Sequence, residues 1–421
     1  MVTFRFPPGP LRADTTVPGD KSLSHRALIL AAMAAGVSRV VGTGPGEDVA
    51  ATRRALGALG VACDGDLVSS PGVDGWAGPA APIDAANSAT TLRLLAGALA
   101  GRPFRTTLVG DASLMRRPMG RLLAPLVALG ASVELGPGGG PPVTVGGAAL
   151  RGADIRLPVA SAQVRSAVAL AALQAVGSST ISSPPGFRDH TERWLEAMGR
   201  GRKLSEVKFL VLPGPVVADI WEVPGDLSSA SFLLAAAALR PGSQVTVRNV
   251  TLNPGRTGFL DVLEAAGARV RRTATGRVHG DPVGDVTVVG EGLRPVRVSG
   301  VPAVRALDEL LLVAVLGAAA TGETIVTGAA ELRVQESDRA AAAGRLIRSL
   351  GGEATELPDG FMISGRGALA GGEVHAGGDH RLAMAAAIAA VISPAGVRVK
   401  GFEAAAVSWP GFVDALETLW S

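Results

Sequence analysis

The chain has 421 residues, of which 47% are hydrophobic and 18% charged, and its formal net charge is +3 at pH 7. This composition excludes a disordered chain, and so small a net charge argues against a nucleic-acid partner. A single cysteine, Cys63, excludes an intrachain disulfide framework and a cysteine-based metal cluster. At this length two domains are expected.

The first residues, MVTFRFPPGPLRADTTV, contain neither the apolar core of a signal peptide nor an amphipathic transit pattern. No uninterrupted apolar run reaches membrane-spanning length. The five histidines show no spacing typical of a metal site. We therefore expect a cytoplasmic protein that needs no metal, no cofactor and no membrane partner.

One pattern occurs six times, at intervals of about 70 residues: a short polar cluster followed by an alanine- and leucine-rich run. Each run predicts a helix whose polar start satisfies free backbone N–H groups and whose body is buried on all sides. The runs begin near Ser22, Ser88, Ser161, Ser228, Asp308 and Asp379.

A second helical pattern lies in the gaps between these runs, and it is amphipathic rather than apolar. Its six segments are TRRALGALG, MGRLLAPLVALG, HTERWLEAMG, FLDVLEAAG, AGRLIRSLGG and FVDALETLW. With strand-like segments such as SRVVGT and SQVTVRNV between them, each period reads as strand, buried helix, strand, amphipathic helix and a strand pair. The repeated order predicts an α/β fold.

Three periods precede residue 225 or so, and three follow it. The tetrapeptide VPGD stands before a polar helix start twice, at 17–20 and 223–226. We therefore expect a domain over residues 20–224 and a second over 225–421 that is completed by residues 1–19. The hinges are expected near 17–21 and 222–227.

Basic residues recur at the helix starts and in the loops before the helices. A helix start carries partial positive charge and free N–H groups, so several starts aimed at one cleft would attract anions. Guanidinium groups bind phosphate and carboxylate through two parallel hydrogen bonds. The residues in question are Lys21, Arg26, Arg93, Arg117, Arg165, Arg188, Arg339 and Arg381.

Three carboxylates are candidates for acid–base chemistry, and each has a structural alternative. Asp308 opens an otherwise apolar helix, where it could equally serve as an N-cap. Glu336 and Asp338 lie close to Arg333 and Arg339 in the sequence, where simple ion pairing is the alternative. No phosphate-loop motif, dinucleotide fingerprint or nucleophile elbow occurs, so neither nucleotide hydrolysis nor covalent catalysis is expected.

Nine segments, in order along nearly the whole chain, resemble the 5-enolpyruvylshikimate-3-phosphate synthase family. They are VPGDKSLSHRALILA, NSATTLRLLAG, GDASLMRRPMGRL, LPVASAQVRSAVALA, RDHTERWLEAMG, VPGDLSSASFLLAAA, LNPGRTGFLDVL, ELRVQESDR and GDHRLAMA. The resemblance implies two similar domains, each of three βαβαββ repeats with buried helices (an inside-out α/β barrel), and an active site in the cleft between them. It also implies transfer of the enolpyruvyl group of phosphoenolpyruvate to the 5-hydroxyl of shikimate 3-phosphate, a step toward chorismate and the aromatic amino acids. Phosphate is released through a non-covalent tetrahedral intermediate.

The resemblance also implies roles for individual residues. Catalysis would rest on Asp308 as base for the hydroxyl, Glu336 as proton carrier at the enol methylene, Lys21 and His380. Shikimate 3-phosphate would contact Lys21, Ser22, Arg26, Ser161, Gln163, Arg188, Asp308 and Gln335. Phosphoenolpyruvate would contact Lys21, Ala89, Arg117, Gln163, Arg339 and Arg381.

Four positions depart from the family pattern. Gln335 stands where the family usually has lysine, which removes a cation near the shikimate hydroxyls. Ala89 stands where the family has glycine, and its methyl group would crowd the inhibitor glyphosate, so insensitivity to glyphosate is expected. Phe187 replaces a frequent serine, and Val407 stands where some members carry lysine.

Two other readings remain open. An enolpyruvyl transferase acting on UDP-N-acetylglucosamine would share the fold, but that family typically carries a cysteine in a mobile loop, whereas Cys63 lies elsewhere. A weakened paralogue could bind anionic metabolites without turnover, a reading motivated by Gln335, Phe187 and Val407. We expect a monomer whose partners are small-molecule substrates.

Overall fold

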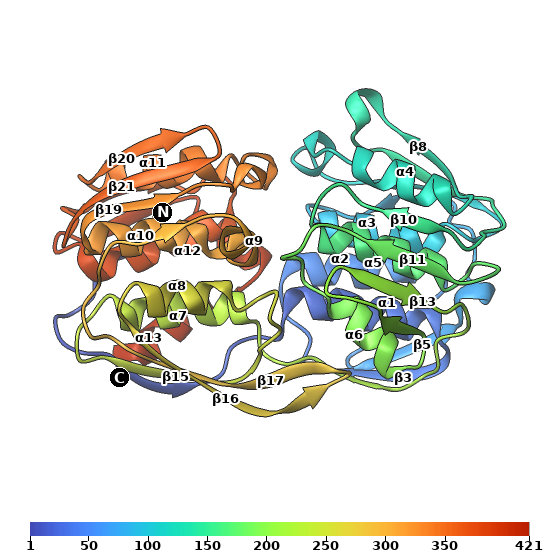
Figure 1. The fold of residues 1–421 in the computed structure, drawn as a ribbon, viewed down its shortest axis with the longest axis horizontal. Coiled ribbons are helices and arrows are strands. Elements are labelled where there is room, and N and C mark those ends of the chain that lie inside the picture. The colour runs from blue at the N-terminus through green and yellow to red at the C-terminus, as the bar shows by residue number, and fades with distance from the viewer. Residues whose placement is uncertain (421) are drawn as a thin grey trace. The chain divides into compact units, whose positions relative to one another are not determined.

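The computed structural model describes residues 1–420, and its chain forms two compact units. The N-terminal unit consists of Gly19–Pro224 together with Arg277–Asp281. The C-terminal unit consists of Met1–Pro18, Gly225–Gly276 and the chain from Pro282 onward. Figure 1 shows the first unit mostly in blue to green and the second mostly in yellow to red. Among the described residues, no helix is both long enough and apolar enough to cross a membrane.

The N-terminal unit holds three four-stranded sheets. Their strand orders are β14–β3–β5–β4, β6–β7–β9–β8 and β10–β11–β13–β12. In each sheet the first two strands are parallel and the remaining pairs are antiparallel. The strands are β3 (Ala35–Val41), β4 (Ala62–Asp64), β5 (Leu67–Pro71), β6 (Ile83–Asp84), β7 (Arg105–Val109), β8 (Ser132–Leu135), β9 (Val143–Gly146), β10 (Asp154–Arg156), β11 (Ser179–Ser182), β12 (Gly201–Lys203), β13 (Lys208–Val211) and β14 (Ile220–Glu222).

Two kinds of helix accompany these sheets. The buried helices are α1 (Lys21–Met33), α3 (Ala89–Leu99) and α5 (Ala162–Ala172). The amphipathic helices are α2 (Glu47–Gly57), α4 (Gly120–Ala128) and α6 (His190–Ala197). Both helical patterns of the sequence are therefore confirmed in this unit, because each predicted run coincides with a helix of the expected burial.

The C-terminal unit repeats the design. Its sheets have the orders β16–β17–β15–β2, β18–β19–β21–β20 and β1–β23–β22. The strands are β1 (Val2–Phe4), β2 (Arg12–Thr15), β15 (Gln244–Thr251), β16 (Arg269–Val278), β17 (Asp281–Val289), β18 (Arg297–Val298), β19 (Thr321–Val326), β20 (Glu353–Leu357), β21 (Gly360–Arg366), β22 (Gly372–His375) and β23 (Val397–Lys400). The helices are α7 (Leu227–Ala238), α8 (Gly258–Ala265), α9 (Val301–Arg305), α10 (Leu310–Ala319), α11 (Arg339–Ser349), α12 (His380–Ala389) and α13 (Phe412–Glu417).

The first strands of two repeats are exchanged along the chain. β2 precedes α1 in sequence but pairs in parallel with β15 of the C-terminal unit, whereas β14 precedes α7 but pairs in parallel with β3. The segments that follow these two strands are the two VPGD sequences. The backbone N–H of the aspartate in each segment donates to the backbone oxygen of the proline in the other segment. Asp20 N lies 2.7 Å from Pro224 O, and Asp226 N lies 2.9 Å from Pro18 O.

Two sequence predictions need correction here. The sixth repeat has no strand pair of its own, because its third strand is β1 from the chain's start, paired antiparallel with β23. The fifth buried helix does not open at Asp308. Residues Leu307–Glu309 form a 3-10 turn, and α10 begins two residues after Asp308.

A hairpin links the units at a place that the sequence analysis did not anticipate. Strands β16 and β17 start and end in the C-terminal unit, but their tip belongs to the N-terminal unit. Fully buried Asp281 accepts hydrogen bonds from His190 Nδ1 at 2.9 Å and from Trp194 Nε1 at 3.1 Å. The His279 ring packs on Trp194 and Trp221, with centroid distances of 5.2 and 4.7 Å. The tip is therefore anchored in the core of the N-terminal unit.

The buried helices approach one another closely because small residues line their contacts. At Gly97 in α3, an added Cβ would lie 2.0 Å from the Ala167 backbone oxygen of α5. Such a contact cannot be relieved by rotating a side chain, since the obstructing atom belongs to the backbone. Gly97 thus sets the spacing between α3 and α5, two of the helices whose starts carry candidate site residues.

We predict that Gly97→Ala destabilises the N-terminal unit by about 1–3 kcal/mol through overpacking. For a unit of this size the melting temperature should fall by roughly 2–12 °C. Differential scanning calorimetry measures the shift. Gly57→Ala is the matched control, since a Cβ there meets nothing within 4 Å and alanine favours a helix. Equal melting temperatures for the two variants would contradict the packing argument.

Candidate active site

The candidate residues fall into two groups, one in each unit, and Lys21 belongs to the first. Asp20 caps α1 by accepting from Leu23 N at 2.9 Å, which places Lys21 in the first helical turn. Lys21 Nζ lies 2.9 Å from Asp48 Oδ2 in the first turn of α2. Both side chains are partly exposed, at 17% and 9%. The pair therefore presents a cation at the start of a buried helix, next to a carboxylate that fixes its position.

Arg26 lies one turn further along α1 and is almost entirely buried. Its guanidinium donates to Thr191 Oγ1 and Ser166 Oγ, both at 2.8 Å, and to Ser22 O at 2.7 Å. Burial lowers the pKa of Arg26 to about 10, and the carboxylates nearby only partly offset this. Arg26 thus joins α1 to α5 and α6, and much of its hydrogen-bonding capacity is used within the unit.

The first turns of α3 and α5 are linked by side chains. Ser88 and Ser161 cap the two helices by accepting from Thr91 N and Val164 N. Gln163 Nε2 donates to Thr90 Oγ1 at 3.0 Å, and Arg93 donates to the Gln163 amide oxygen. Ala89 is the first residue of α3 and is 7% exposed. The structure therefore brings the predicted residues Ala89, Ser161 and Gln163 to two adjoining helix starts.

Arg117 is held at the same place from the loop before α4. Its Nη2 donates to Asn87 Oδ1 at 2.6 Å, while Asn87 Nδ2 donates to Asp111 Oδ2 at 2.7 Å. Asn87 directly precedes the α3 cap. The Arg117 guanidinium is thus tied to the start of α3, the helix that carries Ala89.

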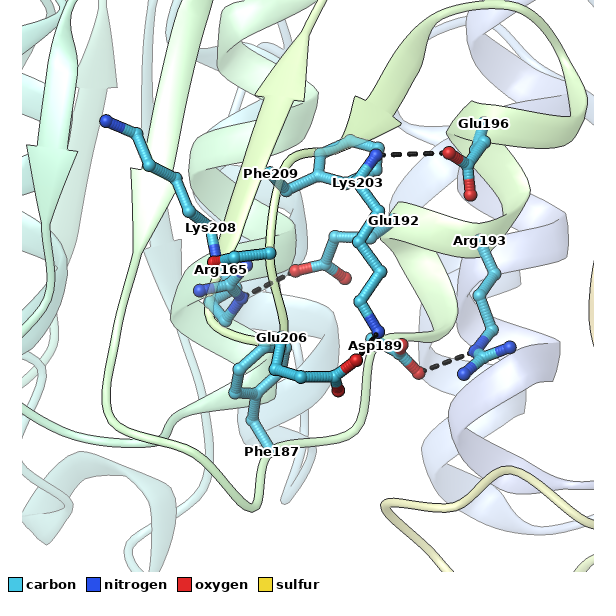
Figure 2. A pocket seen from close by; sticks show the side chains of 11 residues that line it. Arg165, Phe187, Asp189, Glu192, Arg193, Glu196, Lys203, Glu206, Lys208 and Phe209 are labelled. Carbon is cyan, nitrogen blue, oxygen red and sulfur yellow. Dashed lines mark hydrogen bonds and ion pairs between the residues drawn. The ribbon is translucent and has the colours of Figure 1, made fainter.

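Arg188 lies in the loop before α6, between Phe187 and Asp189, which line a small pocket shown in Figure 2. Its neighbour Phe187 packs on the guanidinium of Arg165, whose carbon lies 3.9 Å from the ring centroid. Arg165 is 1% exposed and forms a buried ion pair with Glu192, with an Nε to Oε1 distance of 2.6 Å. Arg165 therefore holds the fold together and is not available to a ligand, whereas half-buried Arg188 is not enclosed in this way.

The second group surrounds Asp308. Three guanidinium groups lie within 4 Å of its carboxylate: Arg256 Nη1 at 3.9 Å, Arg339 Nη1 at 3.7 Å and Arg381 Nε at 3.6 Å. Its side chain is 18% exposed. The N-cap position of α10 belongs to Glu309 and not to Asp308, so the N-cap alternative is wrong. These positive neighbours stabilise its negative charge.

Arg339 pairs with three carboxylates of this group, and only 1% of its side chain is exposed. Its Nε lies 2.8 Å from Asp379 Oδ2, and its Nη2 lies 2.9 Å from Asp379 Oδ1 and 2.8 Å from Glu336 Oε2. Burial opposes the charged form, but Asp379 and Glu336 outweigh it and raise the pKa of Arg339 above its ordinary value. Its charge is therefore permanent, and it orients Glu336, which keeps 18% of its side chain exposed.

Asp379 and the two residues after it form the start of α12. Asp379 caps the helix by accepting from Arg381 N at 2.9 Å. Although burial raises the pKa of Asp379, Arg339 more than compensates, and the pKa lies well below its usual range. His380 is the first residue of α12 and is 1% exposed. Arg381 Nη1 donates to Asp308 O at 3.3 Å and lies 3.7 Å from Glu309 Oε1.

The structure also shows the surroundings of two other predicted residues, Asp338 and Gln335. Asp338 caps α11 through Ala341 N at 3.0 Å and pairs with Arg333 at 2.7 Å, so its structural alternative holds. Gln335 is half-buried at the end of a 3-10 turn, Ala330–Val334. The position of Gln335 next to Glu336 keeps it a candidate for substrate contact.

Sequence reasoning missed two members of the second group, Arg256 and Glu309, and it predicted Asp379 only as the polar start of a buried helix. Arg256 is 4% exposed and pairs with the α7 cap Asp226 at 2.6 Å, and Glu309 accepts from Ser228 Oγ. Only Asp379 carried a usable signal, because aspartate directly before a helix is a typical cap. No group of three or more metal-binding side chains occurs among residues 1–420. That helix starts of both units face one cleft stays a prediction.

Known proteins are similar to this chain along nearly its whole length. The family model described as EPSP synthase (3-phosphoshikimate 1-carboxyvinyltransferase) matches residues 6–416. The 3-phosphoshikimate 1-carboxyvinyltransferase of Halorhodospira halophila is 44% identical over 98% of this chain and 95% of the relative. That of Methylococcus capsulatus is 42% identical over 98% and 96%.

Solved structures give the same result for the fold. EPSP synthase from Acinetobacter baumannii superposes with a TM-score of 0.86 and 35% identity, covering 99% of this chain and 97% of the other. An enolpyruvyl transferase from Streptomyces tendae, at 17% identity, has a TM-score of 0.76, with 99% of this chain and 96% of the other covered, and shares the fold. The chain therefore belongs to the EPSP synthase family, the 3-phosphoshikimate 1-carboxyvinyltransferases.

Proposed function

We propose that this protein transfers the enolpyruvyl group of phosphoenolpyruvate to the 5-hydroxyl of shikimate 3-phosphate and releases phosphate, which makes it a transferase of aromatic amino acid biosynthesis. The observation that carries the proposal, within the family, is the pair of partly exposed carboxylates held by arginines. Asp308 and Glu336 both lie within 4 Å of buried Arg339. Such a pair suits a reaction with two separate proton transfers.

The chemistry divides between these carboxylates. Asp308 takes the proton of the 5-hydroxyl of shikimate 3-phosphate, and the hydroxyl oxygen forms a bond to C2 of phosphoenolpyruvate while Glu336, in its protonated form, delivers a proton to C3. In the tetrahedral intermediate, Glu336 removes a C3 proton and restores the double bond as the C2–O bond to phosphate breaks, and Asp308 gives its proton to the departing phosphate. Lys21 balances the charge of both substrates, and His380 assists from the start of α12. No covalent bond to the protein forms, and no metal or cofactor is required.

Substrate binding is assigned by charge and position. We propose that Arg117, Arg339 and Arg381, with Lys21, Ala89 and Gln163, hold phosphoenolpyruvate. Shikimate 3-phosphate is assigned to Lys21, Asp308 and a set of neighbours: Ser22, Arg26, Ser161, Gln163, Arg188 and Gln335. The starts of α1, α3, α5 and α12 add partial positive charge, which favours phosphate and carboxylate groups. Several cations in partly enclosed surroundings stabilise charge better than the same groups in water.

Domain boundaries, localisation and assembly follow as proposals. The functional domains are residues 20–224 and residues 225–421 completed by 1–19, with hinges near 17–21 and 222–227. We propose a cytoplasmic monomer, because both substrates are phosphorylated metabolites and no further chain is needed to supply the assigned groups. Light scattering coupled to gel filtration tests the monomer.

The function is tested by measuring phosphate released by the purified protein with phosphoenolpyruvate and one acceptor at a time. Shikimate 3-phosphate should support release, and UDP-N-acetylglucosamine should not. Release with the sugar nucleotide alone would favour the other enolpyruvyl transferase. Binding of shikimate 3-phosphate by calorimetry without any release would favour a weakened paralogue.

We predict that Asp308→Asn lowers kcat by about two to four orders of magnitude, the usual effect of removing a general base. The amide keeps the size of the carboxylate but cannot accept the hydroxyl proton. Steady-state phosphate release measures the effect. Asp414→Asn, an exposed change in α13, is the matched control and should retain wild-type kcat. A kcat within threefold of wild type for Asp308→Asn would refute the assigned role.

We propose that Ala89 makes the enzyme insensitive to glyphosate, since its methyl group narrows the space at the start of α3. Ala89→Gly should lower the inhibitory concentration of glyphosate at least about tenfold, an effect in the range of one removed steric clash, while the KM of phosphoenolpyruvate changes little. Ala124→Gly, at an exposed position of α4, controls for the flexibility of glycine in a helix. Unchanged glyphosate potency in Ala89→Gly would reject the explanation.

We predict that Gln335→Lys lowers the KM of shikimate 3-phosphate by about 5- to 50-fold, because an ammonium group forms stronger hydrogen bonds to substrate hydroxyls than an amide does. Initial rates at varied shikimate 3-phosphate measure it. Gln244→Lys, at the exposed first residue of β15, controls for the added net charge. A higher KM in Gln335→Lys would mean that the pocket is adapted to glutamine.

A further inference from the structure

Behind the first turns of α1, α2 and α3 lies a buried chain of hydrogen bonds that none of the roles above uses. His25 Nδ1 lies 2.7 Å from Thr52 Oγ1, and Thr52 Oγ1 lies 2.7 Å from Thr91 Oγ1. Thr91 Oγ1 donates to Ser88 Oγ at 2.8 Å. None of the four side chains has more than 1% of its surface exposed. The chain thus crosses three helices without contact with solvent.

The direction of this chain follows from counting protons. A threonine hydroxyl carries one proton, and Thr91 gives its proton to Ser88. Thr91 must therefore accept from Thr52, and Thr52, having given its proton to Thr91, must accept from His25. His25 consequently carries a proton on Nδ1.

The other ring nitrogen of His25 completes the description of the tautomer. Nε2 is buried and has no hydrogen-bond partner among residues 1–420. A proton there would leave a buried donor unsatisfied, which is costly. Burial, and secondarily the charges of Lys21 and Arg26, also hold the pKa of His25 well below its ordinary value. His25 is therefore neutral, with its single proton on Nδ1.

The Ser88–Thr91 end of the chain reaches candidate site residues. Ser88 Oγ also accepts from Thr91 N at 3.1 Å and so caps α3, whose first two residues are Ala89 and Thr90. Thr91 Oγ1 lies 3.4 Å from the backbone oxygen of Asp48, the residue whose carboxylate pairs with Lys21. The chain thus fixes the start of α3 relative to the Lys21–Asp48 pair.

We propose that His25 is a positioning residue for phosphoenolpyruvate: through Thr52 and Thr91 it sets the orientation of the Ser88 cap. The first turn of α3, with Ala89 and Thr90, is thereby held against the first turn of α1, with Lys21. The inference rests on the proposed function for the identity of the ligand. It predicts that breaking the chain weakens phosphoenolpyruvate binding more than shikimate 3-phosphate binding, since only the former is assigned to the start of α3.

Two pairs of variants test the role. His25→Leu and Thr52→Val break the chain, and each should raise the KM of phosphoenolpyruvate by about 5- to 100-fold, the range for a buried hydroxyl left without its partner. The KM of shikimate 3-phosphate should stay within threefold. His25→Asn and Thr52→Ser restore a donor and a hydroxyl and should recover most of the loss. The double variant His25→Leu/Thr52→Val should be little worse than either single variant, because both interrupt one chain.

Thr106→Val is the matched control. Thr106 is also buried in the N-terminal unit, in β7, but its hydroxyl has no hydrogen-bond partner among residues 1–420. The same exchange of hydroxyl for methyl there should leave both KM values unchanged. Equal effects of Thr52→Val and Thr106→Val, or equal rises in both KM values with no rescue by His25→Asn, would overturn the positioning role.

The tautomer of His25 can be measured without any turnover of substrate. Nitrogen-15 NMR of the five histidines, with His25 assigned by the signal lost in His25→Asn, should show a neutral ring protonated on Nδ1. A proton on Nε2, or a charged ring at neutral pH, would overturn the inference even in an active enzyme. Absence of phosphate release by the wild-type protein would instead overturn the proposed function, and with it the ligand assignment, while the tautomer could still be measured.

Discussion

The arrangement of the second group, the residues around Asp308, depends on the charge of Arg339. A guanidinium removed this far from water is tolerated only if carboxylates surround it with good geometry. Asp379 supplies two of the contacts and at the same time caps α12, so the ion pair and the helix start stabilise each other. Glu336 and Asp308 complete the surroundings and retain some exposure. The candidate catalytic carboxylates therefore owe their positions to a buried structural ion pair.

In the N-terminal unit, other groups stabilise the buried helix starts and the buried arginines. Its buried helix starts are held by an aspartate cap, two serine caps and neutral hydroxyls. Its most deeply buried arginines, Arg26 and Arg165, donate to hydroxyl groups and to Glu192, respectively. The cations that are less deeply buried lie in loops or first turns, such as Lys21 and Arg188. Under the proposed function, one unit mainly supplies binding charge and the other supplies proton transfer.

The sequence was sufficient for the repeated helices. Runs of alanine and leucine after a capping residue specify buried helices locally, and twelve predicted segments coincide with helices. It was insufficient wherever the partner lies far along the chain. The anchoring of Asp281 by His190 spans 91 residues, and the contact of Arg256 with Asp308 depends on how two loops pack. The exchange of β2 and β14 was only partly visible, in the duplicated VPGD.

The structure removes one of the two alternatives that the sequence left open at Asp308, the helix cap. An acidic residue before an apolar run is usually a cap, but here a 3-10 turn moves the start of α10 beyond it. Asp308 therefore lies outside α10, and its carboxylate lies within 4 Å of Arg256, Arg339 and Arg381. Those guanidiniums hold the charge of Asp308 while no substrate is bound, and anionic substrates would compete for the same groups. Binding of phosphate and carboxylate groups would then weaken the hold on Asp308 and make it a better base, which couples substrate binding to proton transfer.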